Sequence, residues 1–181
     1  SYGYTSLTTT GQPCSLLMEQ ATTTLMSLLW PQGENGKEQA LAVKDVYWYG
    51  LDILNGLKYL HNQHVIHRDI KPDNILMFEH GGTLIAKLGD LGLGKQLEKS
   101  YARIIGGAVR YMAPEGFLNN PQLRPVSDVY SFGVMLVEMA VGNPPEMGKQ
   151  RKKKNIQELM KSSIFCDVAL GTMEEDWNER W

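Results

Sequence analysis

The chain has little cysteine, no long apolar run and no recognisable signal sequence. Cys14 and Cys166 are its two cysteines, and their separation lacks the paired spacing of a zinc site. We therefore expect two reduced thiols, although a disulfide between them stays open. No stretch approaches the roughly 18 consecutive apolar residues of a membrane-spanning helix, and residues 1–10 lack the pattern of a signal peptide. The sequence predicts no membrane insertion and a cytoplasmic protein, with the nucleus as the alternative location.

An excess of charge of one sign is also absent. The 181 residues carry a formal net charge of -2, and 43% of them are hydrophobic, which is ordinary for one soluble globular domain. A local basic run at 149–154 could attract nucleic acid, acidic peptides or nuclear import proteins. We favour a solvated loop for this run, and we expect no nucleic-acid partner.

Hydrophobic periodicity predicts one long amphipathic helix in the first half of the chain. The helix is expected over residues 43–63. Its apolar stripe consists of Val46, Tyr49, Ile53, Leu57 and Leu60. Ahead of it, the apolar run 14–18 favours a short strand, and the spacing of apolar residues in 24–30 favours a helical turn.

Short β-rich runs follow the long helix. They lie at residues 65–66, 75–78 and 84–88, and each is rich in β-branched or other apolar residues. His80, Gly81 and Gly82 separate the last two runs and predict a hairpin-like break. We therefore expect a small β structure directly after the helix.

A second helix is expected over residues 129–141. Ser127 or Asp128 is the candidate cap at its start, and Gly142 is the signal for its end. This segment is apolar on nearly all sides, which is typical of a helix in the middle of a core. A further helix is expected near 155–161.

The strongest motif is the run 67–74, which reads His-Arg-Asp-Ile-Lys-Pro-Asp-Asn. It resembles the catalytic loop of the protein kinases, whose pattern is H-R-D-x-x-x-x-N. Phosphoryl transfer needs a carboxylate near the attacking hydroxyl, a cation near the moving phosphate and an oxygen ligand for magnesium. By this resemblance, Asp69 accepts or orients the substrate proton, Lys71 steadies the γ-phosphate of ATP, and Asn74 binds a Mg²⁺ ion.

A second motif follows the catalytic loop at the family's spacing. Asp90-Leu91-Gly92 resembles the D-F-G motif with leucine in place of phenylalanine, and it implies that Asp90 holds the magnesium that bridges the ATP phosphates. The run 110–115, Arg-Tyr-Met-Ala-Pro-Glu, ends in the family's A-P-E motif. We therefore expect an activation segment over residues 90–115.

The expected activation segment departs from the family pattern at two residues. Leu91 keeps an apolar side chain but loses the ring, and Ala108 stands where serine/threonine kinases usually have a threonine. That threonine hydroxyl normally bridges the catalytic aspartate and lysine, so substrate positioning is expected to differ. Ser100 or Tyr101 could be phosphorylated and pair with Arg68, and an unmodified solvated loop is the alternative.

The same resemblance implies an adenine-binding hinge near the start of the chain. The segment 16–21 is similar to the strand that links the two kinase lobes, with a plain edge strand as the alternative. Glu19 and Ala21 are expected to hydrogen-bond adenine through their main chains, and Leu76 is expected to pack beneath it. The resemblance covers about residues 16–181. We therefore expect the N-terminal lobe to be largely absent and the chain to be a fragment.

Two acidic residues are expected to have structural roles. Asp128 resembles the buried aspartate with which the central helix, about 128–141, anchors the catalytic loop, and such a carboxylate needs backbone donors. Glu115 normally has an arginine partner farther along the family's chain. No residue of this sequence is a clear match for that arginine.

These motifs together predict an α+β protein-kinase-like fold, mainly a helical C-terminal lobe with a hinge strand and a small β patch. The resemblance is to serine/threonine kinases, and the phrase 127–133 is most similar to the tyrosine-kinase-like branch. It implies transfer of the ATP γ-phosphate, with Mg²⁺, to a Ser or Thr hydroxyl of a protein substrate. The alternative is a pseudokinase or truncated lobe that acts as a binding or scaffold module.

Overall fold

A computed structural model describes residues 3–4, 16–31, 39–90, 107–118, 123–143, 145–146 and 151–180. Five helices, five strands and several 3₁₀ turns occur in these ranges. The strands are β1 (Gly3–Tyr4), β2 (Leu16–Leu17), β3 (Thr23–Thr24), β4 (Ile75–His80) and β5 (Thr83–Leu88). The helices are α1 (Leu25–Leu29), α2 (Val43–Asn62), α3 (Pro125–Val141), α4 (Lys153–Leu159) and α5 (Cys166–Thr172). The described part is therefore mainly helical with little strand, as predicted.

The main sheet is a hairpin with one short additional strand. β4 and β5 are antiparallel, and β3 pairs with β4 on the other side. Gly81 and Gly82 form the two-residue turn with φ angles of 58° and 80°, a conformation that glycine adopts without strain. The predicted strands at 75–78 and 84–88 and their break are confirmed, whereas β3 was not predicted. β1 and β2 form a separate antiparallel pair.

The predicted strand at 65–66 is wrong, because these residues follow the closing turn of α2. His64 has a φ of 57°, and its N–H donates to the carbonyl of His61 at 3.0 Å. The N–H of Val65 donates to the carbonyl of Leu60, also at 3.0 Å. Together these bonds make a Schellman motif, which satisfies helix carbonyls that would otherwise lack donors. The backbone of Val65 therefore ends the helix instead of joining a sheet.

The long helix α2 packs its predicted stripe into the core. All five stripe residues are buried. On another face of α2, the carboxylate of Asp52 accepts the N–H of Ala86 at 3.1 Å, which attaches β5 to the helix. The hairpin and the end of α2 are therefore held together next to the catalytic-loop motif.

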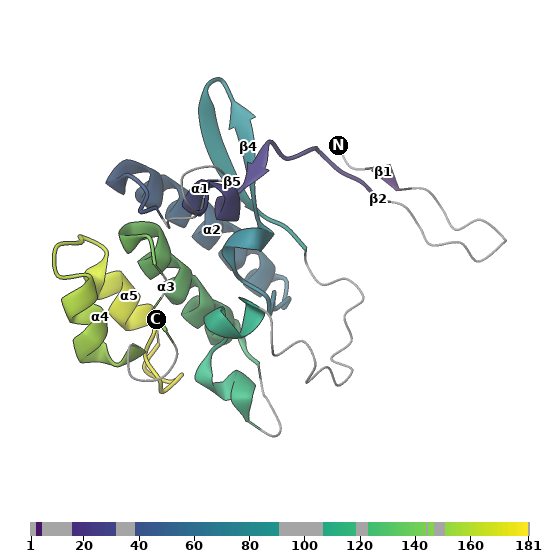
Figure 1. The fold of residues 1–181 in the computed structure, drawn as a ribbon. Coiled ribbons are helices and arrows are strands. Elements are labelled where there is room, and N and C mark those ends of the chain that lie inside the picture. Colours follow the sequence, from purple (N-terminus) through teal and green to yellow (C-terminus); the bar gives the residue numbers. More distant parts are fainter. Residues whose placement is uncertain are drawn as a thin grey trace.

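The central helix is α3, which lies between α2 and α5 (Figure 1). Its residues Phe132, Val134 and Met135 are at most 1% exposed, so the predicted core helix is confirmed. The helix begins at Pro125, earlier than predicted, because a proline at the first position needs no hydrogen-bond acceptor. Ser127 therefore lies inside the helix, and Gly142 ends it with a φ of 82°.

The last part of the chain differs more from expectation. α4 lies near the predicted helix at 155–161, while α5 was not predicted and packs on α3. The expected solvated loop at 149–154 is wrong at Arg151, which is 7% exposed.

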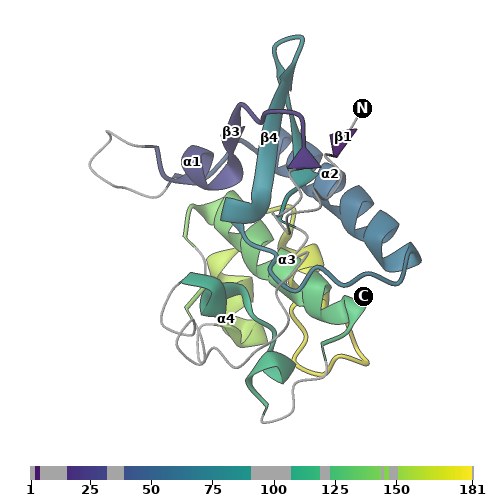
Figure 2. The ribbon, with the colours of Figure 1, turned by 90° about the vertical axis from the view of Figure 1, so that its right-hand side faces the viewer.

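In Figure 2 the β4–β5 hairpin projects from one end of the molecule, away from α4. None of the helices in the described ranges is long and apolar enough to cross a bilayer.

The contact between α3 and α5 depends on one glycine. A Cβ atom on Gly133 would collide with Oγ1 of Thr172 and Cγ of Met173. We predict that Gly133→Ala lowers the free energy of unfolding by about 1–3 kcal/mol through overpacking, measured by urea denaturation. The matched control is Gly50→Ala in α2, where the new atom would lie 3.8 Å from Phe132. The control should be neutral or slightly stabilising, and equal losses in both variants would contradict the prediction.

Candidate active site

The catalytic-loop motif is attached to the central helix by Asp128. This carboxylate is 1% exposed and accepts the backbone N–H groups of His67 at 2.9 Å and Arg68 at 2.8 Å. His61 of α2 lies 2.8 Å from the same carboxylate through Nε2. Arg68 has a φ of 71°, which is unfavourable for a residue other than glycine and requires such support. The predicted anchoring role of Asp128 is confirmed.

The three predicted catalytic residues lie together. Nδ2 of Asn74 donates to the backbone carbonyl of Asp69 at 2.7 Å and to its carboxylate at 2.9 Å. Nζ of Lys71 lies 3.2 Å from the same carboxylate. The side chains of Asp69 and Lys71 are 32% and 21% exposed, so a ligand can reach both. The loop thus presents a carboxylate, an ammonium group and an amide in one cluster.

Hydrogen bonds join the end of β5 to this cluster. Nε2 of His67 lies 2.9 Å from the carbonyl of Gly89, and a carbonyl can only accept, so Nε2 carries the hydrogen. The N–H of Gly89 donates to the carbonyl of Asn74 at 2.8 Å. A Cβ on Gly89 would lie 2.8 Å from Cγ of Leu76, so a larger residue does not fit. The next residue, Asp90, is exposed and has a φ of 47°. It therefore lies directly beside the catalytic loop.

The donor atoms of Asn74 and Asp90 fit a magnesium ion. Because Nδ2 of Asn74 is engaged with Asp69, the amide oxygen Oδ1 is the atom left for a cation. Asp90 adds an exposed carboxylate. Magnesium prefers such oxygen ligands and usually takes the remainder from phosphates and water. The described residues contain no cluster of three or more His, Cys, Asp or Glu side chains that could hold a metal by themselves.

The expected hinge segment lies beside the hairpin. The N–H of Thr22 donates to the carbonyl of Met77 at 2.9 Å, so the chain after Ala21 runs along β4. The carboxylate of Glu19 lies 2.7 Å from Nζ of Lys87, and this hydrogen bond holds the pKa of Glu19 below its ordinary value. Leu76 faces Lys87 in the β4–β5 register. Glu19 thus contacts the hairpin of which Leu76 is a part. The contacts of both residues with adenine stay a prediction.

Part of the expected activation segment cannot be compared with the structure. Leu91, Gly92, Ser100 and Tyr101 lie outside the described residues, and the side chain of Ala108 is not described. The effects of Leu91 and Ala108, and phosphorylation of Ser100 or Tyr101, therefore stay predictions.

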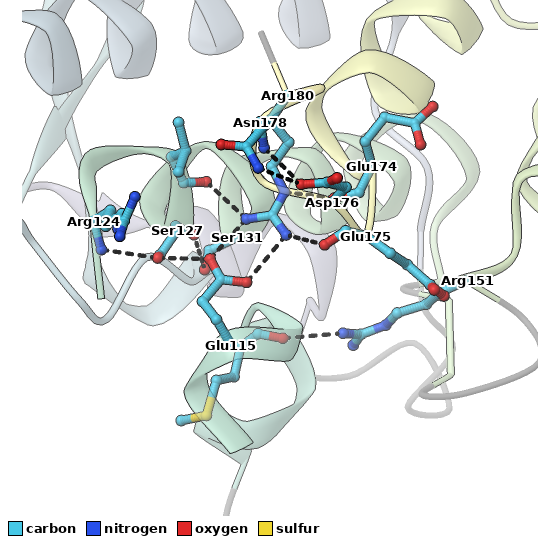
Figure 3. Close-up of polar contacts among 12 residues, drawn as sticks. Glu115, Arg124, Ser127, Ser131, Arg151, Glu174, Glu175, Asp176, Asn178 and Arg180 are labelled. Atoms are coloured by element: carbon cyan, nitrogen blue, oxygen red, sulfur yellow. Dashed lines mark hydrogen bonds and ion pairs between the residues drawn. The ribbon is translucent and has the colours of Figure 1, made fainter. Parts of the chain in front are cut away.

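Glu115 has the arginine partner that sequence reasoning missed. Arg180 donates from Nη1 at 2.7 Å and from Nη2 at 3.0 Å to the two carboxylate oxygens (Figure 3). The hydroxyl of Ser127 donates to the same carboxylate at 2.7 Å. Burial acts to raise the pKa of Glu115, but the bonds from Arg180 and Ser127 outweigh it and the pKa is lowered. Arg180 lies in a polar stretch, and its local sequence gives no sign of a buried role.

A second buried carboxylate was also missed. Glu138 of α3 is 0% exposed and accepts the hydroxyl of Tyr111 at 2.7 Å. Burial, together with the charge of Glu138, raises the pKa of Tyr111 far above its usual range. Nε1 of Trp30 donates to the other oxygen of Glu138 at 3.5 Å. This carboxylate therefore joins the end of the expected activation segment to α3 and to the residue after α1.

Comparisons with known proteins agree with this geometry. The family model "Protein kinase domain" matches residues 3–180. The chain is similar to the serine/threonine-protein kinase mos of Gallus gallus, with 31% identity over 157 residues, which is 78% of this chain and 44% of that protein. It is 39% identical over 107 residues to the mitogen-activated protein kinase kinase kinase 5 of Homo sapiens, which is 56% of this chain and 8% of that protein.

The chain is similar to a third kinase at a comparable identity. The mitogen-activated protein kinase kinase kinase 1a of Physcomitrium patens is 39% identical over 110 residues, which is 60% of this chain and 14% of that protein. The chain thus spans less than half the length of these curated relatives. The family match covers nearly all of the chain, and the catalytic-loop residues lie in one cluster. The chain therefore belongs to the protein kinase family.

Proposed function

We propose that this chain is the catalytic part of a serine/threonine protein kinase, which transfers the γ-phosphate of ATP to a protein hydroxyl. The observation that carries the proposal is the cluster of Asp69, Lys71 and Asn74. Asp90 lies next to this cluster, because it directly follows Gly89, whose N–H donates to the carbonyl of Asn74. A binding module has no evident need for this complete set. The protein kinase family uses ATP and typically Mg²⁺.

Each residue of the cluster has a distinct part in the proposed reaction. Asp69 accepts a hydrogen bond from the attacking hydroxyl and takes its proton as the phosphate is transferred. Lys71 lies near that carboxylate and neutralises negative charge on the transferred phosphate. Asn74 and Asp90 supply oxygen ligands for Mg²⁺, which when bound neutralises charge on the ATP phosphates. Glu19, Ala21 and Leu76 are the proposed adenine contacts.

The proposed substrate is a serine or threonine of another protein. Two sequence features follow the pattern of serine/threonine kinases. They are Lys71, two residues after Asp69, and Tyr111, just before the run 112–115. The relatives named above are likewise a serine/threonine kinase and two mitogen-activated protein kinase kinase kinases. None of these names supports the alternative of a pseudokinase or scaffold module.

The test is phosphate transfer to a mixture of Ser, Thr and Tyr peptides with Mg²⁺ and ATP. Purified protein that carries this chain is expected to yield phosphoserine and phosphothreonine, identified by mass spectrometry. Lys71→Met should lower kcat about a hundredfold, because it removes a cation that acts on the transition state. The control is Lys161→Met, whose lysine is 67% exposed and pairs with Glu158, and it should not change kcat.

Two results would count against this assignment. Phosphotyrosine as the main product would show that the proposed substrate class is wrong. Nucleotide binding without any transfer would favour the binding-module alternative instead.

A further inference from the structure

Half of the exposed large hydrophobic side chains in the described part of the chain lie on the solvent side of α2. They are six of twelve, with exposures of 38% to 67%, and they comprise Val43, Tyr47, Trp48, Leu51, Leu54 and Tyr59. A surface helix normally has charged and polar residues opposite its buried stripe. Single exposed apolar residues are ordinary, but a gathered set on one helix indicates a contact surface. We call this side the outer face of α2.

Helical spacing makes the outer face continuous. Tyr47, Leu51 and Leu54 follow one another at steps of four and three residues, so they form one ridge along the helix. Trp48 lies beside the ridge, with its ring centroid 5.2 Å from that of Tyr47 in an edge-to-face arrangement. Tyr59 lies about three turns beyond Trp48 on the same side. Figure 2 shows α2 along one edge of the molecule, where a partner has access to it.

The outer face has positive charge and no negative charge. Its two charged residues are Lys44 and Lys58, which are exposed and lie about 21 Å apart along the helix axis. Neither makes an ion pair within the described residues. The half-buried Asp52 faces β5, where it accepts the N–H of Ala86, and Asp45, two turns earlier, lies on that same side. The outer face thus combines apolar side chains with two cations that have no carboxylate partner.

This charge pattern does not suit a second copy of the chain or a membrane. In a symmetric contact the outer face would meet itself, and because it has no carboxylate, neither lysine gains an opposite charge in any register. An antiparallel pair of α2 helices centred on Leu51 would even place the two lysines opposite each other. Attraction to an anionic bilayer depends on the net charge near its surface, and here Asp45 and Asp52 offset both lysines.

We propose that the outer face of α2 binds an amphipathic helix of another protein, whose apolar stripe is flanked by Asp or Glu. Such a helix packs along α2 at an interaxial distance of roughly 8–10 Å, with its stripe on the ridge. Its carboxylates lie at contact distance from Lys44 and Lys58, which fixes its orientation. Tyr47 and Trp48 supply the large aromatic contacts that dominate the energy of many interfaces. The surface contains no residue of the catalytic loop, so this binding does not depend on phosphotransfer.

The test measures the binding of two labelled helical peptides to purified protein that carries this chain, by fluorescence anisotropy. Both peptides have about 18 residues and leucines at the i, i+3, i+4 and i+7 spacing of one apolar stripe. One has glutamate on both sides of the stripe, and the other has lysine there. The glutamate peptide should bind at least about tenfold more tightly, and this difference should shrink at high salt concentration.

Substitutions of exposed residues locate the bound peptide without disturbing the core. Trp48→Ala and Leu51→Ala should each weaken binding of the glutamate peptide about tenfold. Lys44→Glu combined with Lys58→Glu should reverse the preference, so that the lysine peptide binds more tightly. This reversal is a gain of binding, which a misfolded variant cannot show. The control is Ile164→Ala, between α4 and α5, which is 73% exposed and should leave both affinities unchanged.

Three results would overturn the proposal. The first is a glutamate peptide that does not bind, or that binds no more tightly than the lysine peptide. The second is a dimer in analytical ultracentrifugation that Trp48→Ala dissociates, which would assign the outer face to a second copy. The third is co-sedimentation with phosphatidylserine vesicles that Trp48→Ala abolishes, which would assign the outer face to a membrane.

Discussion

Asp69→Asn is expected to lower kcat for peptide phosphorylation by a factor of about 10² to 10⁴ while the KM for ATP changes little. The amide can still accept the bond that Asn74 now donates to the carboxylate at 2.9 Å, so the loop keeps its shape. It cannot accept the proton of the attacking hydroxyl, and it loses the ion pair with Lys71 at 3.2 Å. The loss should therefore appear in the chemical step, measured as kcat by steady-state kinetics.

The matched control for this prediction is Asp73→Asn. Asp73 belongs to the same loop, carries the same charge and is exposed in the 3₁₀ turn η1 (Pro72–Asn74). Within the described residues, the hydrogen bonds and ion pair of Asp69 are with Asn74 and Lys71 and not with Asp73, so replacing Asp73 should change kcat by less than about twofold. Wild-type turnover in Asp69→Asn, or equal losses in both variants, would remove Asp69 from the proposed mechanism.

The sequence predicts those parts of the site that depend on short spacing. Asp69, Lys71 and Asn74 lie within six residues, and one loop brings them together through hydrogen bonds that reach no farther than five residues. The long helix α2 is likewise predicted from local sequence, because its apolar residues from Val46 to Leu60 recur on one face, and they are buried as expected. The local sequence pattern is sufficient to predict a feature where one segment supplies both the residues and their contact partners.

The residues that sequence reasoning missed have partners far away in the chain. Arg180 pairs with Glu115 across 65 positions, and Trp30 bonds to Glu138 across 108. Arg151 lies in a basic run that locally indicates a solvated loop, yet it is buried, and one of its two carbonyl acceptors, Met112, lies 39 positions away. A single sequence shows charge and hydropathy but not which distant segment will cover a residue. Tertiary contacts therefore decide these cases.

The errors in element boundaries have a related cause. The sequence predicts Ser127 or Asp128 as the cap of a helix over 129–141, because both residue types are good caps, yet both lie inside α3. The hydroxyl of Ser127 accepts the N–H of Arg124 at 3.0 Å and donates to Glu115, while Asp128 accepts from the catalytic loop. Ser127 therefore does cap the start of α3, but from the third position of the helix and toward the N–H of Arg124, while Asp128 serves a contact with another segment.

Arg180→Met is expected to lower the free energy of unfolding by about 3–5 kcal/mol. The pair with Glu115 is buried, with side chains 0% and 3% exposed, so the variant leaves a carboxylate without its main partner in the interior. Urea denaturation measures the loss. The control is Lys153→Met, which breaks an ion pair whose side chains are 65% and 34% exposed and should cost less than about 1 kcal/mol.

The double variant and the pH dependence separate the charge from the packing. Replacing both Glu115 and Arg180 by Met removes the unpaired charge, so it should be more stable than Arg180→Met alone. In the wild type the pKa of Glu115 lies below its ordinary value of 4.5, so the pair contributes fully above that pH and is lost as the pH falls through the folded-state pKa. Glu115→Gln should therefore show a smaller loss of stability on acidification below pH 4.5 than the wild type. An unchanged acid slope in Glu115→Gln would mean that the carboxylate does not control this transition, and a double variant no more stable than Arg180→Met would assign the loss to packing.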